Sequence, residues 1–313
     1  MKLNEFLALT DDERQNIINN AINARKVRNT RPEEIRTATR AAEKIAAGMR
    51  INVEEFEALT GVMFSHYMTG KMLNILSLST NCLCNPVCLA RIRAGVGICA
   101  ECFAASVESQ YSGVFENTAY NASILANMII SVNMLPEINA DELRIESFGD
   151  TANWKQAANY LNMARVNPLV KVTAWTKNPN HYHEAIKRGY SKPENFTLII
   201  SSLELNKPCD IKEEYAPIID KRFTVYTLDW MDNNGIGAGF INCGGRSCKN
   251  CQRCYNNASV TGFDVRELLK NDAKKAAARG GQWSAWDDGP AIDELPVNET
   301  KSAVADILAM FGK

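Results

Sequence analysis

The 313-residue sequence is poor in net charge, in histidine and in long apolar runs. Its 35 Lys and Arg residues are offset by 36 Asp and Glu residues, so the net charge of −1 predicts no general attraction to nucleic acid or to an anionic membrane. No apolar run approaches the roughly 20 residues of a membrane-spanning helix. The first residues also lack the apolar stretch of a signal peptide. We therefore expect a cytoplasmic protein, in the host cytoplasm if a phage encodes it, with no membrane partner.

The sequence offers little evidence for two common classes of active site. Only three histidines are present, at His66, His181 and His183, which is too few to favour a histidine–carboxylate metal centre. The sequence also lacks the Gly-x-Ser-x-Gly turn of many serine hydrolases. The chemistry must therefore come from other residue types.

Strand-like and helix-like segments alternate through the middle of the chain. Strands are predicted at residues 73–80, 143–148, 170–175, 196–202 and 223–228, and helices between them include residues 117–133 and 154–165. This alternation is typical of βαβ units and a parallel sheet. We predict an α/β fold, with parallel strands in a (β/α) barrel or partial barrel. An open doubly wound sheet is the alternative.

The composition divides the chain into three expected regions: a helical N-terminal region at 1–70, a barrel-like metal-binding domain at 71–262, and C-terminal helices with a linker at 263–313. Helices are predicted at 10–26, 32–48 and 53–59, and later after Gly262 and at 301–311. Residues 1–50 carry an excess of basic residues. They could contact the phosphates of a nucleic acid or form a solvated helix face.

The distribution of the cysteines is the most unusual feature of the sequence. Nine of the ten fall into two groups, and only Cys209 stands apart. The first group is Cys82, Cys84, Cys88, Cys99 and Cys102, and the second is Cys243, Cys248, Cys251 and Cys254. Clustered cysteines in the cytosol are more often metal ligands or redox groups than disulfides. Short spacings let thiolates converge on a [4Fe-4S] cluster or on zinc. We expect one or two [4Fe-4S] clusters, with zinc as the alternative.

Each cysteine group follows a predicted strand. Loops after the carboxyl ends of parallel strands lie on one face of a barrel, where active sites form. We therefore expect both groups at the same mouth, either as two centres or as one site that draws on both. A cluster held by three thiolates leaves one iron open to a ligand, whereas a closed four-cysteine centre would transfer electrons or fix the loop.

Three charged residues are candidates for catalysis at that mouth. Asp150 and Asp229 each end a predicted strand and could act as nucleophile, base or partner of a cation. Lys177 closes another strand and could hold a phosphate or carboxylate. The simpler interpretations are a helix cap for Asp150 and a solvated loop residue for Lys177.

Several motifs in residues 73–256 resemble the bacteriophage gene-product-88 family, whose activity is largely unassigned. They are Cys102-Phe-Ala-Ala-Ser106 with Glu108-Ser109, Glu146-Ser-Phe-Gly-Asp150, Ala174-Trp-Thr-Lys177 and the second cysteine group. The family's Cys-Pro opening is replaced by Cys82-Leu-Cys84-Asn-Pro86, which leaves the choice of ligand between Cys82 and Cys84 open. Cys99 could be a spare thiol.

The arrangement is also similar to that of radical S-adenosylmethionine enzymes, which carry three cluster cysteines after the first strand of a partial barrel. The turn Phe148-Gly149-Asp150 lies where those enzymes receive the amino group of S-adenosylmethionine, although the usual Cys-x3-Cys-x2-Cys run is absent. The resemblance implies an open cluster on Cys88, Cys102 and one of Cys82 or Cys84, with Asp150 holding the amino group.

The leading hypothesis is therefore an iron–sulfur protein with radical or redox activity. One rival is a zinc-stabilised barrel transferase that modifies a nucleobase in DNA or tRNA, with Asp150 and Asp229 as nucleophile and base. Another is a non-enzymatic metal-binding protein that engages a host partner through its N-terminal helices.

Overall fold

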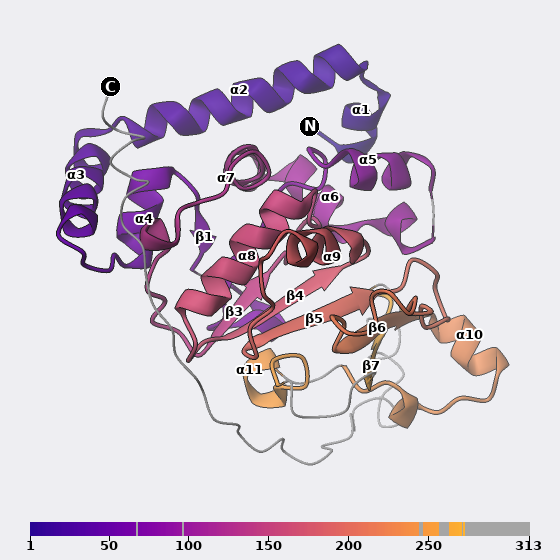
Figure 1. Cartoon of the computed structure of the whole chain (residues 1–313). Helices are drawn as coiled ribbons and strands as arrows, with labels where there is room; N and C mark the ends of the chain where they lie inside the picture. Colours follow the sequence, from indigo (N-terminus) through magenta and orange to yellow (C-terminus); the bar gives the residue numbers. More distant parts are fainter. Residues whose placement is uncertain (67, 96, 244–246, 257–262, 271, 273–313) are drawn as a thin grey trace.

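The computed structural model describes residues 1–66, 68–95, 97–243, 247–256, 263–270 and 272 (Figure 1). A seven-stranded sheet forms its centre, with the strands side by side in chain order. The strands are β1 (Phe64–Ser65), β2 (Leu76–Leu78), β3 (Glu142–Ile145), β4 (Lys171–Thr176), β5 (Phe196–Ser201), β6 (Lys221–Tyr226) and β7 (Phe263–Leu268). Strand β1 is antiparallel to β2, and every later pair is parallel. The predicted α/β class with a mostly parallel sheet is confirmed.

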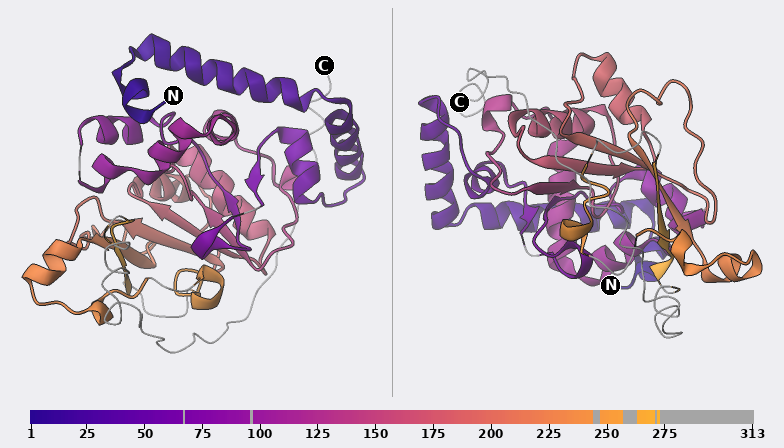
Figure 2. Two further views of the ribbon diagram at one scale, coloured as in Figure 1. Left: turned by 180° about the vertical axis from the view of Figure 1, so that it is seen from behind. Right: turned by 90° about the horizontal axis from the view of Figure 1, so that it is seen from below.

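One face of the sheet packs against helices. Successive side chains of a strand point to opposite faces, and Leu143, Val172 and Ala174 share the main core with α8 (Trp154–Val166) and α9 (Asn180–Lys187). The opposite face carries Trp175 and Ile199, which pack against Tyr255. Figures 1 and 2 show the helices on one side and α11 (Cys248–Cys251) on the other.

The N-terminal helices occupy the predicted positions. They are α1 (Leu3–Ala8), α2 (Asp11–Asn29), α3 (Pro32–Ala46) and α4 (Val53–Thr60). The backbone N–H of Glu13 donates to Thr10 Oγ1 at 3.3 Å, and the N–H of Thr10 donates to Glu13 Oε2 at 2.8 Å. This capping box satisfies backbone donors that the first turn of a helix leaves open, so it fixes where α2 begins.

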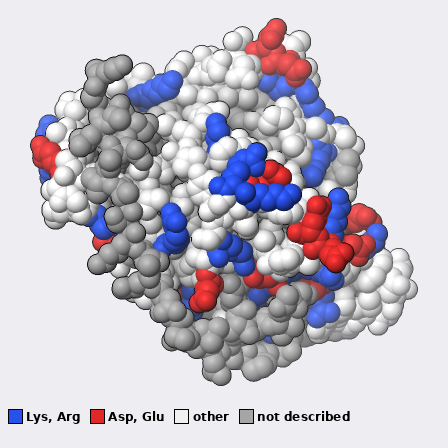
Figure 3. All heavy atoms as spheres, in the orientation of Figure 1, with Lys and Arg blue, Asp and Glu red and all other residues white. Residues whose placement is uncertain are grey.

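Many basic residues of the N-terminal helices already have partners inside the chain. Arg28 pairs with Glu116, and Lys44 Nζ lies 2.5 Å from Glu55 Oε1. Arg25 is buried, with Nη2 at 2.6 Å from the sulfur of Met63. On the face drawn in Figure 3, basic and acidic side chains are interspersed. These contacts leave fewer cations for a phosphate backbone than the sequence count indicates.

Several boundaries differ from the expected ones. The helix expected at 117–133 is α7 (Ser112–Leu125), and the strand expected at 73–80 has three residues. Residues 263–268, where a helix was expected to follow Gly262, form β7 instead. Their Asp264, Val265 and Arg266 alternate in the manner of a strand and pair with β6. The expected linker at 280–296 and helix at 301–311 lie outside the described residues.

No helix among the described residues is long and apolar enough to cross a membrane.

The N-terminal region is packed onto the rest of the protein through Phe6. Its side chain is fully buried, and its ring lies 6.0 Å from that of Phe115 in an edge-to-face arrangement. The same core cluster contains Cys82 and Ala105, with Cys88 and Cys102 partly buried against it. Helices α1 and α2 therefore cover the segment that carries the first cysteine group.

We predict that Phe6→Ala lowers the free energy of unfolding by about 3 to 5 kcal/mol, because truncation of a buried aromatic ring leaves a cavity. Urea unfolding of the reduced protein measures the change. Val27→Ala is the matched control, since Val27 is 68% exposed on α2 and its truncation should change little. Equal effects of the two substitutions would contradict the packing described here.

Candidate metal centres

The first cysteine group lies in the loops that follow β2. Asn85 caps α5 (Pro86–Arg93) by accepting the N–H of Val87 at 3.0 Å, and this helix carries Cys88. Cys99 lies in the short helix η2 (Gly97–Glu101), and Cys102 precedes α6 (Phe103–Gln110). The group therefore stands beyond the carboxyl end of a parallel strand, as the sequence predicted.

The loop after β5 supports the segment that contains Cys99. The N–H of Ile98 donates to the carbonyl of Leu203 at 3.0 Å. Gly97 has φ of +49°, and a Cβ there would lie 1.9 Å from the same carbonyl oxygen. Only glycine fits such a close approach, so the position of η2 depends on a strand about a hundred residues away in the chain.

Cys102 is the most acidic thiol of the group. The neighbouring Cys82 thiol, the nearby backbone N–H groups of Ala105 and Ala104, and the charge of Lys177 lower its pKa to about 6 against the effect of burial. A thiolate is the form that binds metals and reacts as a nucleophile. Cys102 is thus prepared for either role at neutral pH.

The other thiols of the first group divide into two sets. Burial raises the pKa values of Cys88 and Cys99, and both also feel Cys102, Asp150 and the opposing charge of Lys177. Burial likewise raises the pKa of Cys84, but the charge acting on it is that of Glu108. The structure therefore brings Cys88, Cys99 and Cys102 toward Lys177, and it places Cys84 in a different environment.

Glu108 is a buried acid that sequence reasoning did not single out as functional. Its Oε2 accepts hydrogen bonds from the backbone N–H and the thiol of Cys82, both at 3.0 Å. Burial raises its pKa to about 8, so the carboxyl group is mainly protonated at neutral pH. Its position within the motif after Cys102 was the only available signal. Glu108 fixes Cys82, which in turn contacts Cys102.

The turn expected to cradle S-adenosylmethionine is occupied by the chain itself. Gly149 has φ of +82°, and a Cβ there would lie 2.3 Å from the carbonyl oxygen of Thr80. Its close approach is therefore to the loop after β2. Phe148 stacks on the ring of Phe103, with centroids 6.3 Å apart.

The carboxylate of Asp150 is also engaged. Oδ1 accepts hydrogen bonds from the N–H of Thr151 at 2.8 Å and the hydroxyl of Thr176 at 2.7 Å, and Oδ2 accepts the N–H of Lys177 at 2.9 Å. Its backbone carbonyl accepts a hydrogen bond from Asn85 Nδ2 at 2.9 Å. Asp150 thus ties the end of β4 to the N-terminus of α5.

Glu146 is a second buried acid. The sequence analysis named it only as part of a motif and gave it no function of its own. It follows β3 with φ of +57°, an uncommon conformation for a residue other than glycine. The side chains of Thr80, Gln156 and Tyr160 all donate to its Oε1, and the N–H of Thr80 donates to Oε2 at 3.0 Å. A carboxylate directly after an apolar strand was the signal in the sequence. Burial raises its pKa to about 7.

Asp229 does not end a strand. Strand β6 ends at Tyr226, and Asp229 is an exposed residue in the first turn of α10 (Leu228–Asn233), which Thr227 caps. An acidic residue there suits the positive end of the helix dipole. The expectation that Asp150 and Asp229 each end a strand is wrong, because Asp150 also lies beyond the end of its strand, β3, at Ile145.

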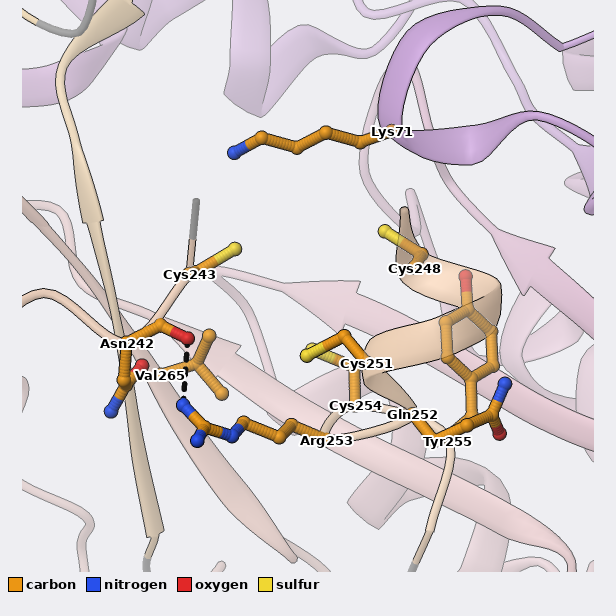
Figure 4. Close-up of a pocket in the computed structure, with 10 residues that line it drawn as sticks. All are labelled: Lys71, Asn242, Cys243, Cys248, Cys251, Gln252, Arg253, Cys254, Tyr255 and Val265. Carbon is orange, nitrogen blue, oxygen red and sulfur yellow. Dashed lines mark hydrogen bonds between the residues drawn. The ribbon is translucent and has the colours of Figure 1, made fainter. Parts of the chain in front are cut away.

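The second cysteine group surrounds a single pocket. Cys243 lies beside β7, where its N–H donates to the carbonyl of Arg266 at 2.9 Å. Cys248 and Cys251 belong to α11, and Cys254 follows it after a turn at Gln252 with φ of +55°. All four cysteines line the pocket, and Figure 4 shows their sulfur atoms directed into the space between them.

Cations accompany these four thiols. Burial raises the pKa of Cys254 to about 12, and the charges of Arg144 and Lys221 oppose that shift. Lys71 lines the same pocket. Burial raises the pKa values of Cys243 and Cys248, and the charge of Lys71 opposes that shift. Positive charges close to buried thiols favour the thiolate form, which is the form that metal binding requires.

The second group lies against the sheet face that the helices leave uncovered. Gln252 Nε2 donates to Glu142 Oε1 at 2.7 Å, and Lys249 Nζ pairs with Asp141 at 3.2 Å. The buried ammonium of Lys221 donates to the carbonyls of Arg253 and Asn256. These contacts are with the amino ends of β3 and β6, whereas the first group lies beyond carboxyl ends. Cys243, however, lies beside Glu267 near the carboxyl end of β7. The expectation that both groups share one mouth is therefore not met for α11, which Figure 1 shows apart from α5 and α6.

Within the described residues, no three His, Cys, Asp or Glu side chains are arranged to hold a single metal ion. Comparison of the chain with protein-family models, with curated proteins and with solved structures finds no match. The arguments for function therefore rest on the residues themselves.

The buried acid Glu146 predicts a pH-dependent stability. The unfolded chain releases this proton near pH 4.5 and the folded chain near pH 7, so the free energy of unfolding falls as pH rises between these values. The full loss is about 3 kcal/mol at 1.36 kcal/mol per pKa unit. Urea unfolding between pH 4.5 and 8 measures it. The control Glu146→Gln has no proton to release, and parallel curves for the two proteins would contradict the assignment.

Proposed function

We propose that the protein is an iron–sulfur protein with two cysteine-ligated centres and that it acts as a redox enzyme. The observation that carries the proposal is the second cysteine group, whose four sulfur atoms face one pocket from two separate chain segments. Cys248 and Cys254 also pack against the apolar cluster around Tyr255, but four cysteines lining one pocket supply the thiol set that a cluster or a zinc ion requires.

The charges around the pocket fit such a centre. Four thiolates bring a negative charge that is costly to bury without partners. Lys71, Arg144 and Lys221 stand close enough to act on these cysteines. A closed centre would be held by Cys243, Cys248, Cys251 and Cys254. Its role would be to transfer electrons or to fix the loop.

The first centre would be held by Cys88, Cys99 and Cys102. The charge of Lys177 acts on all three thiols and that of Asp150 on Cys88 and Cys99, whereas Cys82 is held by Glu108. This choice departs from the set that the resemblance implies, Cys88 and Cys102 with one of Cys82 or Cys84, and takes Cys99 as the third ligand. An iron–sulfur cluster supplies one-electron chemistry, and three thiolate ligands leave one iron for a further ligand.

The chain's own residues prepare this first site in three ways. Asp150 orients Lys177 and α5, Glu108 fixes Cys82 against Cys102, and α1 and α2 shield the loop from water. S-adenosylmethionine stays a proposed ligand. Its amino group would have to compete with the donors that already occupy Asp150.

The order of the strands supports a partial (β/α) barrel as the scaffold. Open doubly wound sheets reverse their strand order at a switch point, where ligands bind. Here β2 to β7 run in chain order without a reversal. A sheet that grows in one direction, with α8 and α9 on one face, is the arrangement from which a barrel is built.

Zinc in the second pocket is the alternative metal, because four cysteines also suit a structural zinc site. The transferase hypothesis receives less support, since Asp229 is an exposed residue of α10 and both carboxylate oxygens of Asp150 are occupied. Engagement of a host partner through the N-terminal helices also receives less support, because several of their cations are paired within the chain.

Metal analysis of anaerobically purified protein tests the proposal. We expect a brown protein with about eight irons and eight sulfides per chain, the content of two cubane clusters. Cys102→Ser and Cys251→Ser should each lose about half of the iron, and their double variant nearly all of it. Cys209→Ser is the control, since this cysteine belongs to neither group. Colourless protein that contains zinc, or full iron content in both single variants, would refute the proposal.

A further inference from the structure

Lys177 lies at the edge of the sheet where the first cysteine group stands. It directly follows β4, and its N–H is fixed on Asp150 Oδ2 at 2.9 Å. Its ammonium group makes no ion pair with a carboxylate in the part of the chain that the structure describes. Its charge nevertheless reaches Cys88, Cys99 and Cys102. The described part of the chain thus supplies no carboxylate partner for this ammonium, which lies near enough to the three thiols for its charge to act on them.

Arg91 is a second cation at the same place. It lies three residues after Cys88 on α5, so the two side chains share one face of that helix. Its Nη1 atom is buried and has no hydrogen-bond partner among the described residues. A bound anion is one group that would satisfy such a donor. Arg91 also acts on Cys99, together with Lys177.

The loops hold these two cations in a fixed relation. Asp150 accepts the N–H of Lys177 through its side chain and the amide of Asn85 through its carbonyl, and Asn85 caps the helix that carries Arg91. The cations thus come from the loops after β2 and β4, at the carboxyl edge of the sheet. Ligands of α/β proteins bind at this edge.

We propose that Arg91 and Lys177 form a binding site for a carboxylate or phosphate group beside the first cysteine group. A guanidinium presents a planar fork of donors to such an anion, and an ammonium adds a point charge. The statement that this anion is part of the substrate rests on the proposed function. The anion site itself does not depend on that function. The reaction would accordingly take an anionic substrate, held by its charged group next to Cys99 and Cys102.

Alkylation of Cys102 in the metal-free, reduced full-length protein tests the site. Iodoacetate and iodoacetamide attack the same thiolate, but only iodoacetate carries a carboxylate. We expect the ratio of the iodoacetate rate to the iodoacetamide rate to exceed that of the urea-unfolded chain by about three- to tenfold, because two charge-assisted contacts would hold the anion. Peptide mass spectrometry reads the modification at Cys102 and Cys99 separately.

Arg91→Gln and Lys177→Gln should each lower this ratio, and the double variant should return it to the value of the unfolded chain. Arg93→Gln is the matched control, because Arg93 lies on the same helix but faces Asp11 at 3.4 Å. Circular dichroism checks that each variant is folded, and the two single variants test the site independently. A wild-type ratio equal to that of the unfolded chain, or an unchanged ratio in the double variant, would overturn the proposal.

Competition separates the two chemical sources of the anion. Inorganic phosphate and acetate are each added to the iodoacetamide reaction at constant ionic strength. Stronger protection of Cys102 by phosphate indicates a phosphate site, and equal or stronger protection by acetate indicates a carboxylate site. Protection by neither would refute both. Since no metal is present in these reactions, a protein without clusters but with a high ratio would refute the proposed function and leave the anion site standing.

Discussion

The candidate chemistry at the carboxyl edge depends on one buried carboxylate, that of Asp150. Its side chain holds the residues that end β4, and its carbonyl holds the residue that starts α5. A loop residue engaged on both its side chain and its backbone has little freedom to move. Cys88 and Arg91 on α5 and Lys177 after β4 belong to the segments that Asp150 joins, whereas Cys99 and Cys102 lie in the segments that follow α5. Asp150 therefore acts first by positioning these segments.

The outline of the fold could be predicted from the sequence, because the longer helices and most of the parallel strands have local sequence patterns. Alternating apolar runs mark β4 and β5, and the Thr10 and Glu13 pair marks the start of α2. β7 was not predicted because three of its six residues, Asp264, Arg266 and Glu267, are charged. Its partner β6 supplies the reason to be extended, and that reason lies some forty residues away.

The candidate site could be predicted only in part, for the same reason. Cysteine spacing indicates which residues gather, but not which face of the sheet receives them. The contacts of Gln252 with Glu142 and of Lys221 with Arg253 place α11 and the segment after it at the amino ends of β3 and β6, and no short motif predicts this placement. Arg91 was equally invisible, since its significance lies in an unpartnered buried nitrogen atom. Glu108 and Glu146 look like ordinary surface acids until their burial is known.

The chain-order arrangement of the sheet has a consequence for biogenesis. Each strand from β2 onward pairs first with the strand made just before it, so the sheet can extend while the ribosome is still at work, and domains generally do fold as they emerge. The first cysteine group is made early, yet Cys99 gains its support only after the strand before Leu203 exists. The second group is made late, and Cys243 gains its contact with β7 only after that strand exists. Assembly of the two sites would thus be separated in time, and the earlier cysteines must stay reduced while they wait for the later strands.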